Sequence, residues 1–525
     1  MDDPTGKNQN TNSGVLRPKS NNTKKRSDDV KEPKQDVILI DISSQHCQFF
    51  HNAQKEAYAK VDINGHKEVW SIQSSGFADW LRHQYWTKHR KAVTKITFES
   101  VLGVLRAQAV FDGECEEVFI RVAQSDKKIY IDICNDSWQV IEVSDAEWQI
   151  INHSPVAFVR SSNMRPLPMP MANGDIDLLK KHINIRDNEF PLIVGWLLMS
   201  LQAGSGAYPI LIFQGSAGTG KTTCSRMLRA LVDPNVADLL SKPRTEHMRV
   251  IGANNHVLAF DNLSGISNDY SDCLCKISTG DSQTVRKLYT TNEEFTISIK
   301  KPILLNGIDE IARRGDLVSR SIKIKLNQIN SSDRKTDSSL WSEYFKDTPF
   351  ILGALLDGLS VALALRNDTK ISELSRMGDF CQWATAGGKS FDWDDDRFMS
   401  AYRRSIQSSF IDSLEASTFA SAIVKMFEHR SGFTGTPLDL LEQLESCYAN
   451  EKAVKSGKWV TTAKGVMTQL DRHQEALEKV GIYFEKTRDR TNKTMVKLYT
   501  NEESISSNTQ TTDEWISEYK FTEVS

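Results

Sequence analysis

Short apolar runs alternate with amphipathic stretches through the middle of the chain, and they predict an α/β fold. Residues 210–213, 257–260 and 302–305 are apolar runs of strand length, with the sequences ILIF, VLAF and PILL. Runs of this kind are typical of strands that are buried inside a sheet. Residues 222–231 carry apolar side chains at helical spacing, so a helix is expected directly after the first strand.

The link between this strand and this helix fits the phosphate-loop pattern G-x-x-x-x-G-K-[ST] at every specified position. It consists of Gly215, Ser216, Ala217, Gly218, Thr219, Gly220, Lys221 and Thr222, and Thr223 follows. Glycine lets backbone N–H groups close around phosphate oxygens, and the helix N-terminus adds partial positive charge. Lys221 supplies a charge for the β- and γ-phosphates, and Thr222 is the expected Mg²⁺ ligand. The sequence therefore predicts an ATP site that uses Mg²⁺.

Polar residues end the next two predicted strands, where a metal ion and a water molecule would need them. Asp261 follows residues 257–260, and a carboxylate there holds Mg²⁺ or its water opposite the phosphate loop. The next residue is Asn262, where many such ATPases carry a catalytic Glu. Either another acid serves as the base, or catalysis depends on positioning and charge. Asn306 is placed to position the attacking water; a strand-ending turn residue is the alternative.

A hairpin is predicted over residues 286–299, where two β-rich runs flank a Thr-Asn-Glu-Glu turn. Hairpins at this place in ring-shaped helicases project into the central pore. Arg286 and Lys287 are placed to meet a phosphate backbone there. An ordinary surface hairpin is the alternative interpretation.

Three arginines follow within one short segment: Arg313, Arg314 and Arg320. In ring ATPases an arginine that reaches the γ-phosphate of a neighbouring subunit completes the active site. Arg320, at the foot of the alternating strand 321–326, is the first choice for this role. Arg313 and Arg314 are the alternatives, and a surface ion pair is the other interpretation of any of the three.

Helical periodicity continues after this region and predicts a lid or connector over residues 331–410. Helices are expected over residues 339–366 and 374–385. Arg376 in the second helix is either a residue that senses the nucleotide from the lid or an ion-paired arginine.

Residues 411–500 have the pattern of a winged helix. Helices are expected over residues 416–429, 437–448 and 462–480, and strands over residues 482–486 and 494–499. The last helix would enter a major groove while the strand pair follows the phosphates. The basic side chains of this wing are Lys486, Arg488, Arg490 and Lys493. Contact with another protein is the alternative use of such a domain.

Residues 36–160 show a separate α/β pattern, which predicts an N-terminal accessory domain. Strands are expected at residues 37–40, 119–123, 128–132 and 138–141, and helices at 77–85 and 98–109. No catalytic set of residues is recognisable in this stretch. Between the two helices lie Lys88, His89, Arg90, Lys91 and Lys95, either as a contact for a phosphate backbone or as a solvated loop.

Composition narrows the class of protein only slightly. The 525 residues carry a net charge of −3, so any basic surface must be local. The eight cysteines are scattered, which favours reduced thiols over a zinc site. The polar N-terminus has no signal peptide, and the apolar run 191–201 is too short to span a bilayer. We therefore expect a cytoplasmic protein without membrane contact, with a disordered tail over residues 1–35, a linker over 161–174 and an acidic tail over 501–525.

The run from Gly215 to Leu326 resembles the AAA+ core of superfamily 3-type helicases. The matching segments are the phosphate loop, FDNLS, TGD with the RKLY hairpin downstream, PILLNGI and DLVSRSI. The run also resembles ATP-binding helicase-like proteins that prophages and mobile elements encode, some beside primases. This resemblance implies an AAA+ core over residues 175–330, MgATP between subunits, an arginine finger in trans and a hexamer that moves along DNA. Asn262 departs from the many relatives that have an acid there.

The predicted fold class is α/β, with an AAA+ P-loop core, a helical lid, an N-terminal α/β domain and a C-terminal winged helix. The predicted function is that of an ATP-dependent DNA helicase or translocase of a phage or mobile element. We expect a homo-hexamer with single-stranded DNA in its pore and duplex DNA at the winged helix, and a primase or other replication protein as partner. A replication initiator or loader that does not unwind DNA, and a nucleotide-gated switch or defence NTPase, are the alternatives.

Overall fold

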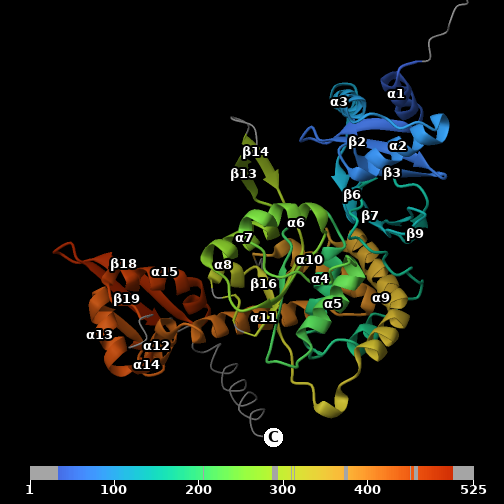
Figure 1. Cartoon of the computed structure of the whole chain (residues 1–525). Coiled ribbons are helices and arrows are strands. Elements are labelled where there is room, and N and C mark those ends of the chain that lie inside the picture. The colour runs from blue at the N-terminus through green and yellow to red at the C-terminus, as the bar shows by residue number, and fades with distance from the viewer. Residues whose placement is uncertain are drawn as a thin grey trace, which may run out of the picture.

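The computed structural model describes residues 33–204, 206–286, 294–308, 310–312, 314–371, 376–449, 451–454 and 459–500. These residues form a central body with an N-terminal body at one end and a C-terminal body at its side (Figure 1). The acidic tail expected over residues 501–525, and nearly all of the tail expected over residues 1–35, lie outside the described residues.

A four-stranded parallel sheet forms the centre of the fold. Its strands, in spatial order, are β12 (Leu258–Leu263), β15 (Ile303–Gly307), β11 (Ile210–Gln214) and β16 (Ser321–Lys325). Leu211 and Phe213 face one hydrophobic core, whereas Ile210 and Ile212 face a second core on the other side of the sheet. Burial on both faces explains why these strands are uninterrupted apolar runs in the sequence. The three strands predicted from those runs are confirmed.

Helices cover both faces of this sheet. The first core includes residues of α4 (Phe190–Ser200), α5 (Lys221–Val232), α9 (Asp337–Leu365), α10 (Gly378–Gly388) and α11 (Asp395–Glu415). The second core includes residues of α6 (Met248–Asn254), α7 (Asn268–Thr279) and α8 (Gly315–Val318). Short 3-10 helices connect these elements: η1 (Ile176–Lys181), η2 (Thr245–His247), η3 (Ser331–Asp333) and η4 (Lys389–Phe391).

Two helices of the first core are strongly apolar. Every residue of α4 is buried, so nearly all of the apolar run 191–201 lies in a core helix. In the described part of the chain, α9 alone combines the length and the composition that could cross a membrane. Of its most apolar window, 61% is buried inside the protein. A core helix of a folded domain shows this burial, because its apolar side chains pack against the sheet and the neighbouring helices.

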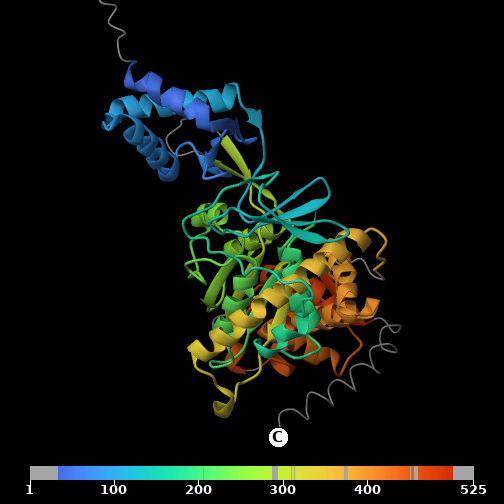
Figure 2. The same cartoon turned by 90° about the vertical axis from the view of Figure 1, so that its right-hand side faces the viewer.

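A hairpin is present before β15, but its first strand covers residues 282–286 and so begins before the stretch 286–299 that was predicted for the hairpin. β13 (Ser282–Arg286) pairs antiparallel with β14 (Glu294–Ser298), and Arg286 lies opposite Glu294. In both views the hairpin projects from the central body toward the end that carries the N-terminal body (Figures 1 and 2). Residues 287–293, which include Lys287, lie outside the described residues.

The N-terminal stretch divides between two cores. The first part contains α1 (Gln35–His46), β1 (Cys47–His51), β2 (Ala57–Ile63), β3 (His66–Ser71), α2 (Ser75–His89), α3 (Lys95–Phe111) and β4 (Glu114–Cys115). Its sheet has the order β3-β2-β1-β4, and its core is separate from that of the central body. β5 (Val118–Phe119) pairs with β10 (Ala157–Phe158). The chain between these two strands forms an antiparallel meander of β6 (Val122–Ser125), β7 (Lys128–Asp132), β8 (Val140–Val143) and β9 (Trp148–Ile151). Ile129, Ile131 and Ile141 of this meander belong to the first core of the central body.

Two strands predicted for this stretch are corrected by the structure. Residues 37–40 lie within α1, a helix that buries Leu39 and Ile42 on one side. A four-residue apolar run fits a strand and one turn of a helix equally well, and here the longer helix is the outcome. The strand expected over residues 119–123 is interrupted. β5 ends at Phe119, β6 begins at Val122, and Arg121 between them is buried in the interior.

The C-terminal body combines helices with a small sheet. Its helices are α12 (Thr418–Phe427), α13 (Pro437–Cys447), α14 (Glu451–Val454) and α15 (Ala463–Lys479). β17 (Gly432–Gly435), β19 (Thr494–Thr500) and β18 (Ile482–Arg488) form an antiparallel sheet in that order. Buried residues of α12, α13 and α15 join the second core of the central body, so this body is attached to the sheet by apolar packing. The three longer helices and the strand pair lie where the sequence predicted them.

Candidate functional site

The phosphate-loop residues connect β11 to α5 at the carboxyl edge of the central sheet. Gly218 and Gly220 have φ values of 82° and 83°, in the left-handed region that glycine adopts without strain. A Cβ atom on Gly220 would lie 3.2 Å from Ile329, and one on Gly218 would lie 3.2 Å from the guanidinium of Arg334. The loop therefore requires glycine at both positions, and its backbone N–H groups are left accessible beside the N-terminus of α5.

Lys221 is the first residue of α5, and its side chain folds back over the loop. Its ammonium group donates to the carbonyl oxygens of Gly215 and Ser216 over 2.8 and 2.7 Å. Burial lowers the pKa of Lys221, and the carboxylate of Asp261 opposes this effect. The cation is thus held at the mouth of the loop by two weak partners that phosphate oxygens would replace with stronger, charge-assisted bonds.

Asp261 and Thr222 meet across the carboxyl edge of the sheet. The Thr222 hydroxyl donates to Oδ1 of Asp261 over 3.0 Å, although 39 residues separate them in sequence. The backbone N–H of Asp261 donates to Leu240 over 2.9 Å, which fixes the end of β12. A hydroxyl and a carboxylate at this spacing form two adjacent oxygen ligands for Mg²⁺. The pairing expected from the sequence is present in the structure.

Asn262 and Asn306 are coupled through the backbone. The register of β12 against β15 shifts after Phe260, and Asn262 adopts a φ of 54° in this irregular segment. Its N–H donates to Oδ1 of Asn306 over 2.8 Å, and Nδ2 of Asn306 donates to the Ser225 hydroxyl of α5 over 3.0 Å. Asn306 is 1% exposed, so both ends of its amide serve the protein itself. In this geometry Asn306 positions the segment after Asp261 and connects it to the loop helix.

A cleft of about 600 Å³ lies beside the loop, and sequence reasoning missed the segments that build it. Its walls come from residues 181–184 before α4 and from residues 328–343, which run from the end of β16 into α9. Asn184 donates to the carbonyl oxygens of Thr219 and Asn327, and Ser216 donates to Gln328 over 2.8 Å. The signal in the sequence was the polar run NQINSSDRK directly after β16. The volume lies in the range of small-molecule and nucleotide pockets.

Arg320, the first choice for the finger arginine, lies at the opposite edge of the sheet from its own phosphate loop. The carbonyl of Arg320 accepts from the N–H of Ile210, the first residue of β11, whereas the loop follows the last residue of that strand. Five strand residues place these two edges roughly 16 Å apart. Arg320 and the loop of the same subunit therefore face different sides of the sheet.

Arg320 and Arg376 share one carboxylate. Asp316 pairs with Arg320, and it lies 2.6 Å from Nη2 of Arg376. The two arginines also hold the pKa of Asp316 below its usual range, against the effect of burial. The ion-paired interpretation of Arg376 is therefore confirmed. Arg314 lies nearby on Asp272 at 2.5 Å, and Arg313 lies outside the described residues.

The described residues that were predicted to contact DNA lie on other elements than this cluster. Arg286 is the last residue of β13 and the last described residue before the gap at 287–293. In the C-terminal body, Lys486 and Arg488 lie on β18 and Arg490 and Lys493 lie in the following turn, all exposed. Asp489 orders this turn by accepting from Thr491 and Lys493. α15 contacts α8 with part of its surface, so only its remaining face is open.

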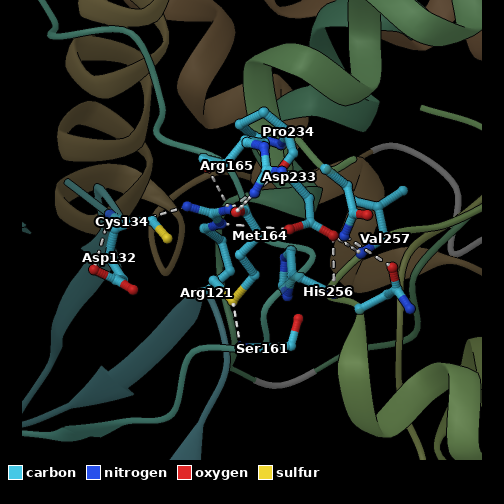
Figure 3. A network of polar contacts seen from close by, with 12 residues as sticks. Arg121, Asp132, Cys134, Ser161, Met164, Arg165, Asp233, Pro234, His256 and Val257 are labelled. Atoms are coloured by element: carbon cyan, nitrogen blue, oxygen red, sulfur yellow. Dashed lines mark hydrogen bonds and ion pairs between the residues drawn. The ribbon is translucent and has the colours of Figure 1, made fainter. Parts of the chain in front are cut away.

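A buried ionic network joins the meander to the far end of α5 (Figure 3). Arg121 is fully buried and donates from Nε to Asp233, the residue that ends α5, over 3.3 Å. Its other nitrogens donate to backbone carbonyls, among them that of Asp132. The second oxygen of Asp233 accepts from the N–H groups of His256 and Val257, which lead into β12. Burial lowers the pKa of His256 to about 4, so this histidine is neutral.

Replacing Arg121 by methionine should lower the free energy of unfolding by about 3–5 kcal/mol, because it leaves the carboxylate of Asp233 buried without its cation. Denaturant unfolding of the full chain measures this loss. Arg403→Met is the matched control, since Arg403 forms an exposed pair with Asp396, 40% and 67% exposed. The control should cost less than about 1 kcal/mol. Equal midpoints for the two variants would contradict the stabilising role of Arg121.

The residues at the loop fit a nucleotide with Mg²⁺. The glycine positions form a cradle that a Cβ would obstruct, Lys221 is held by weak partners, and Thr222 and Asp261 provide adjacent oxygens. No group of three or more His, Cys, Asp or Glu residues able to hold a metal ion occurs in the described part of the chain. Mg²⁺ does not need one, because it commonly takes one or two protein ligands together with phosphates and water.

The parallel sheet, the glycine loop after β11 and the acid within β12 define the class: a mixed α/β protein with a phosphate-loop sequence at the carboxyl edge of its sheet. Two family models match the chain. The model described as "Actinomycete integrative conjugative element replication protein" matches residues 176–410, and the "AICE RepA C-terminal domain" matches residues 419–512. Together they cover more than half of the chain. The chain belongs to this family of replication proteins of integrative conjugative elements.

Solved structures align with the chain at low similarity. The SCCmec type IV Cch active helicase is 12% identical, with 87% of this chain and 93% of that chain covered and a TM-score of 0.45. The NrS-1 C-terminal region is 10% identical, with 89% and 100% covered and a TM-score of 0.38. The JCV helicase is 15% identical, with 42% and 67% covered and a TM-score of 0.24. No curated protein matches the chain.

Proposed function

We propose that the protein is an ATP-dependent DNA helicase or translocase in the replication of an integrative conjugative element. Residues 175–330 would be its AAA+ core, residues 331–410 the lid and residues 411–500 a winged helix, in a cytoplasmic homo-hexamer. The observation that carries the proposal is the division of charged groups between the two edges of one sheet. Lys221, Thr222 and Asp261 lie at the carboxyl edge, and Arg320 lies at the amino edge.

In this proposal the carboxyl edge binds ATP and Mg²⁺. Lys221 would exchange the carbonyls of Gly215 and Ser216 for the β- and γ-phosphates, while Thr222 and Asp261 hold the metal ion. Bound Mg²⁺ supplies charge neutralisation for phosphoryl transfer. Asn306 acts as a positioning residue through Asn262, whose exposed side chain would orient water without accepting its proton.

A subunit ring supplies what a single chain does not bring together. Arg320 of one subunit would reach the phosphates bound to the next, at the cost of its pair with Asp316. The hairpin β13–β14, with Arg286 at the end of β13 and Lys287 next to it in the sequence, would contact single-stranded DNA in the pore. The exposed cations of the β18–β19 turn would contact duplex DNA, and a primase or another replication protein would join the assembly.

Asn262 favours a second candidate function. Since the residue after Asp261 carries no acid, hydrolysis would be slow if no other acid reaches the water. An initiator or loader, which assembles on DNA with ATP but does not unwind it, needs no fast turnover. A nucleotide-gated switch likewise needs no fast hydrolysis of ATP.

The test is ATP hydrolysis and strand displacement measured on the same preparation of the full chain. The proposal expects hydrolysis that single-stranded DNA stimulates, and ATP-dependent displacement of a strand from a forked duplex. DNA-stimulated hydrolysis without displacement would favour the initiator or loader. Slow hydrolysis that ignores DNA, together with ATP-driven oligomerisation, would favour the switch.

A further inference from the structure

A stripe of basic and aromatic side chains on the N-terminal body has no role in the function proposed above. Arg82 and Trp86 lie on α2, and Arg90 is the residue that caps its C-terminus. Because they are spaced by four residues, these three side chains follow one face of the helix. All three are exposed, and 49% of the Trp86 surface is open to solvent. We call these three residues the α2 stripe.

The surroundings of the α2 stripe carry charge of one sign. Residues 80–98 contain five Lys or Arg residues and no Asp or Glu. The bordering acids are exposed: Asp79 lies 3.4 Å from Arg82, and Glu99 lies 3.8 Å from Lys95. Such surface pairs are weak and screened by salt. In a chain with a net charge of −3, this corner is a local positive field.

Aromatic rings hold the two guanidinium groups of the stripe. The Cζ atom of Arg90 lies 4.2 Å from the centre of the Trp86 ring, and that of Arg82 lies 4.0 Å from the centre of the Phe98 ring. Arg90 has a φ of 51°, a backbone state in which glycine or asparagine would cap the helix with less strain. Arginine in that state places a cation over one face of an indole that is still 49% exposed. A helix end that needed only solubility would not require this arrangement.

We infer that the α2 stripe binds single-stranded DNA, with a base stacked on Trp86 and backbone phosphates on Arg82 and Arg90. Exposed aromatic rings between cations are the means by which proteins hold single strands without reading their sequence. The inference rests on the proposed function, because it extends the DNA path from the hairpin. β13–β14 projects toward the end of the molecule that carries the N-terminal body (Figures 1 and 2), so a strand that passes the hairpin meets this body.

The test is the affinity of the full chain for a fluorescein-labelled oligothymidylate, measured by anisotropy at several salt concentrations. The variant Arg82→Glu/Arg90→Glu should bind at least about tenfold more weakly, and the slope of log K against log salt should fall by about 1.4. Trp86→Ala should also lose about tenfold, and Trp86→Phe should retain most of the affinity because it keeps a stacking ring. ATP hydrolysis without DNA should be unchanged in all three.

The matched control is Lys55→Glu/Lys127→Glu, which reverses two exposed charges at turns outside the stripe. Parental affinity in the stripe variants would overturn the inference and leave the proposed function intact. No binding of single-stranded DNA by the parent would defeat both. Unchanged DNA affinity with loss of a co-purifying protein would identify the stripe as a protein contact instead. If Trp86→Ala unfolds, the charge-reversal pair decides, since its side chains are exposed.

Discussion

Lys221→Ala should reduce ATP hydrolysis by about 10³-fold or more while leaving the fold intact. The loss follows because the Lys221 ammonium is the cation that the structure holds at the mouth of the loop, where charge develops on the transferred phosphoryl group. The fold should survive because this side chain bonds only to the carbonyls of Gly215 and Ser216, which water can solvate instead. Steady-state phosphate release by the full chain, with and without single-stranded DNA, measures the effect.

The control for this experiment is Arg403→Ala, which removes an exposed cation on α11 far from the loop. It should hydrolyse ATP at the parental rate. Thermal unfolding of both variants should coincide with that of the parent to within a few degrees. A Lys221→Ala protein that hydrolyses ATP as fast as the parent would remove the loop from the chemistry, and with it the assignment of ATP to this edge of the sheet.

The loop and the strand-end acid could be predicted because their signals are local. Eight consecutive residues specify the cradle, and strands buried on both faces are visible as apolar runs. The meeting of Thr222 with Asp261 also follows from sequence, since the carboxyl ends of parallel strands share one edge. The rest of the cleft did not follow. Residues 181–184 and 328–343 approach the loop only through the path of the chain, and no spacing between them marks a site.

Other failures have equally physical causes. An arginine within an alternating strand pattern is normally exposed, so nothing in the sequence distinguishes the buried Arg121 from a surface residue. The run at residues 37–40 is too short to separate a strand from one helical turn. The presence of asparagine at position 262 is explained by the backbone conformation, which the sequence does not show. Asparagine tolerates the left-handed conformation of this position better than glutamate does. Local geometry thus accounts for the absence of an acid at position 262. Asparagine there cannot act as a general base.

Arg320→Ala should also reduce ATP hydrolysis by about 10³-fold. Mixing it with subunits of the Lys221→Ala variant should restore part of the activity. Within one chain, Arg320 and the phosphate loop lie at opposite edges of the sheet. In the proposed ring the arginine would therefore act on the nucleotide of a neighbour. Arg320→Ala and Lys221→Ala should each be inactive alone. When mixed and reassembled, they should regain part of the parental rate, because a loop with Lys221 then meets a neighbour with Arg320.

Two further variants decide how Arg320 acts. Arg320→Lys keeps a cation beside Asp316 but lacks the planar fork, so it should fold like the parent and remain strongly impaired in hydrolysis. Arg314→Ala tests the neighbouring candidate, which pairs with Asp272. Complementation by Arg314→Ala but not by Arg320→Ala would move the finger to Arg314. No complementation in either mixture, with full hydrolysis by isolated monomers, would mean that the site is complete in one chain, and Arg320 and Arg314 would then serve only to bind Asp316 and Asp272.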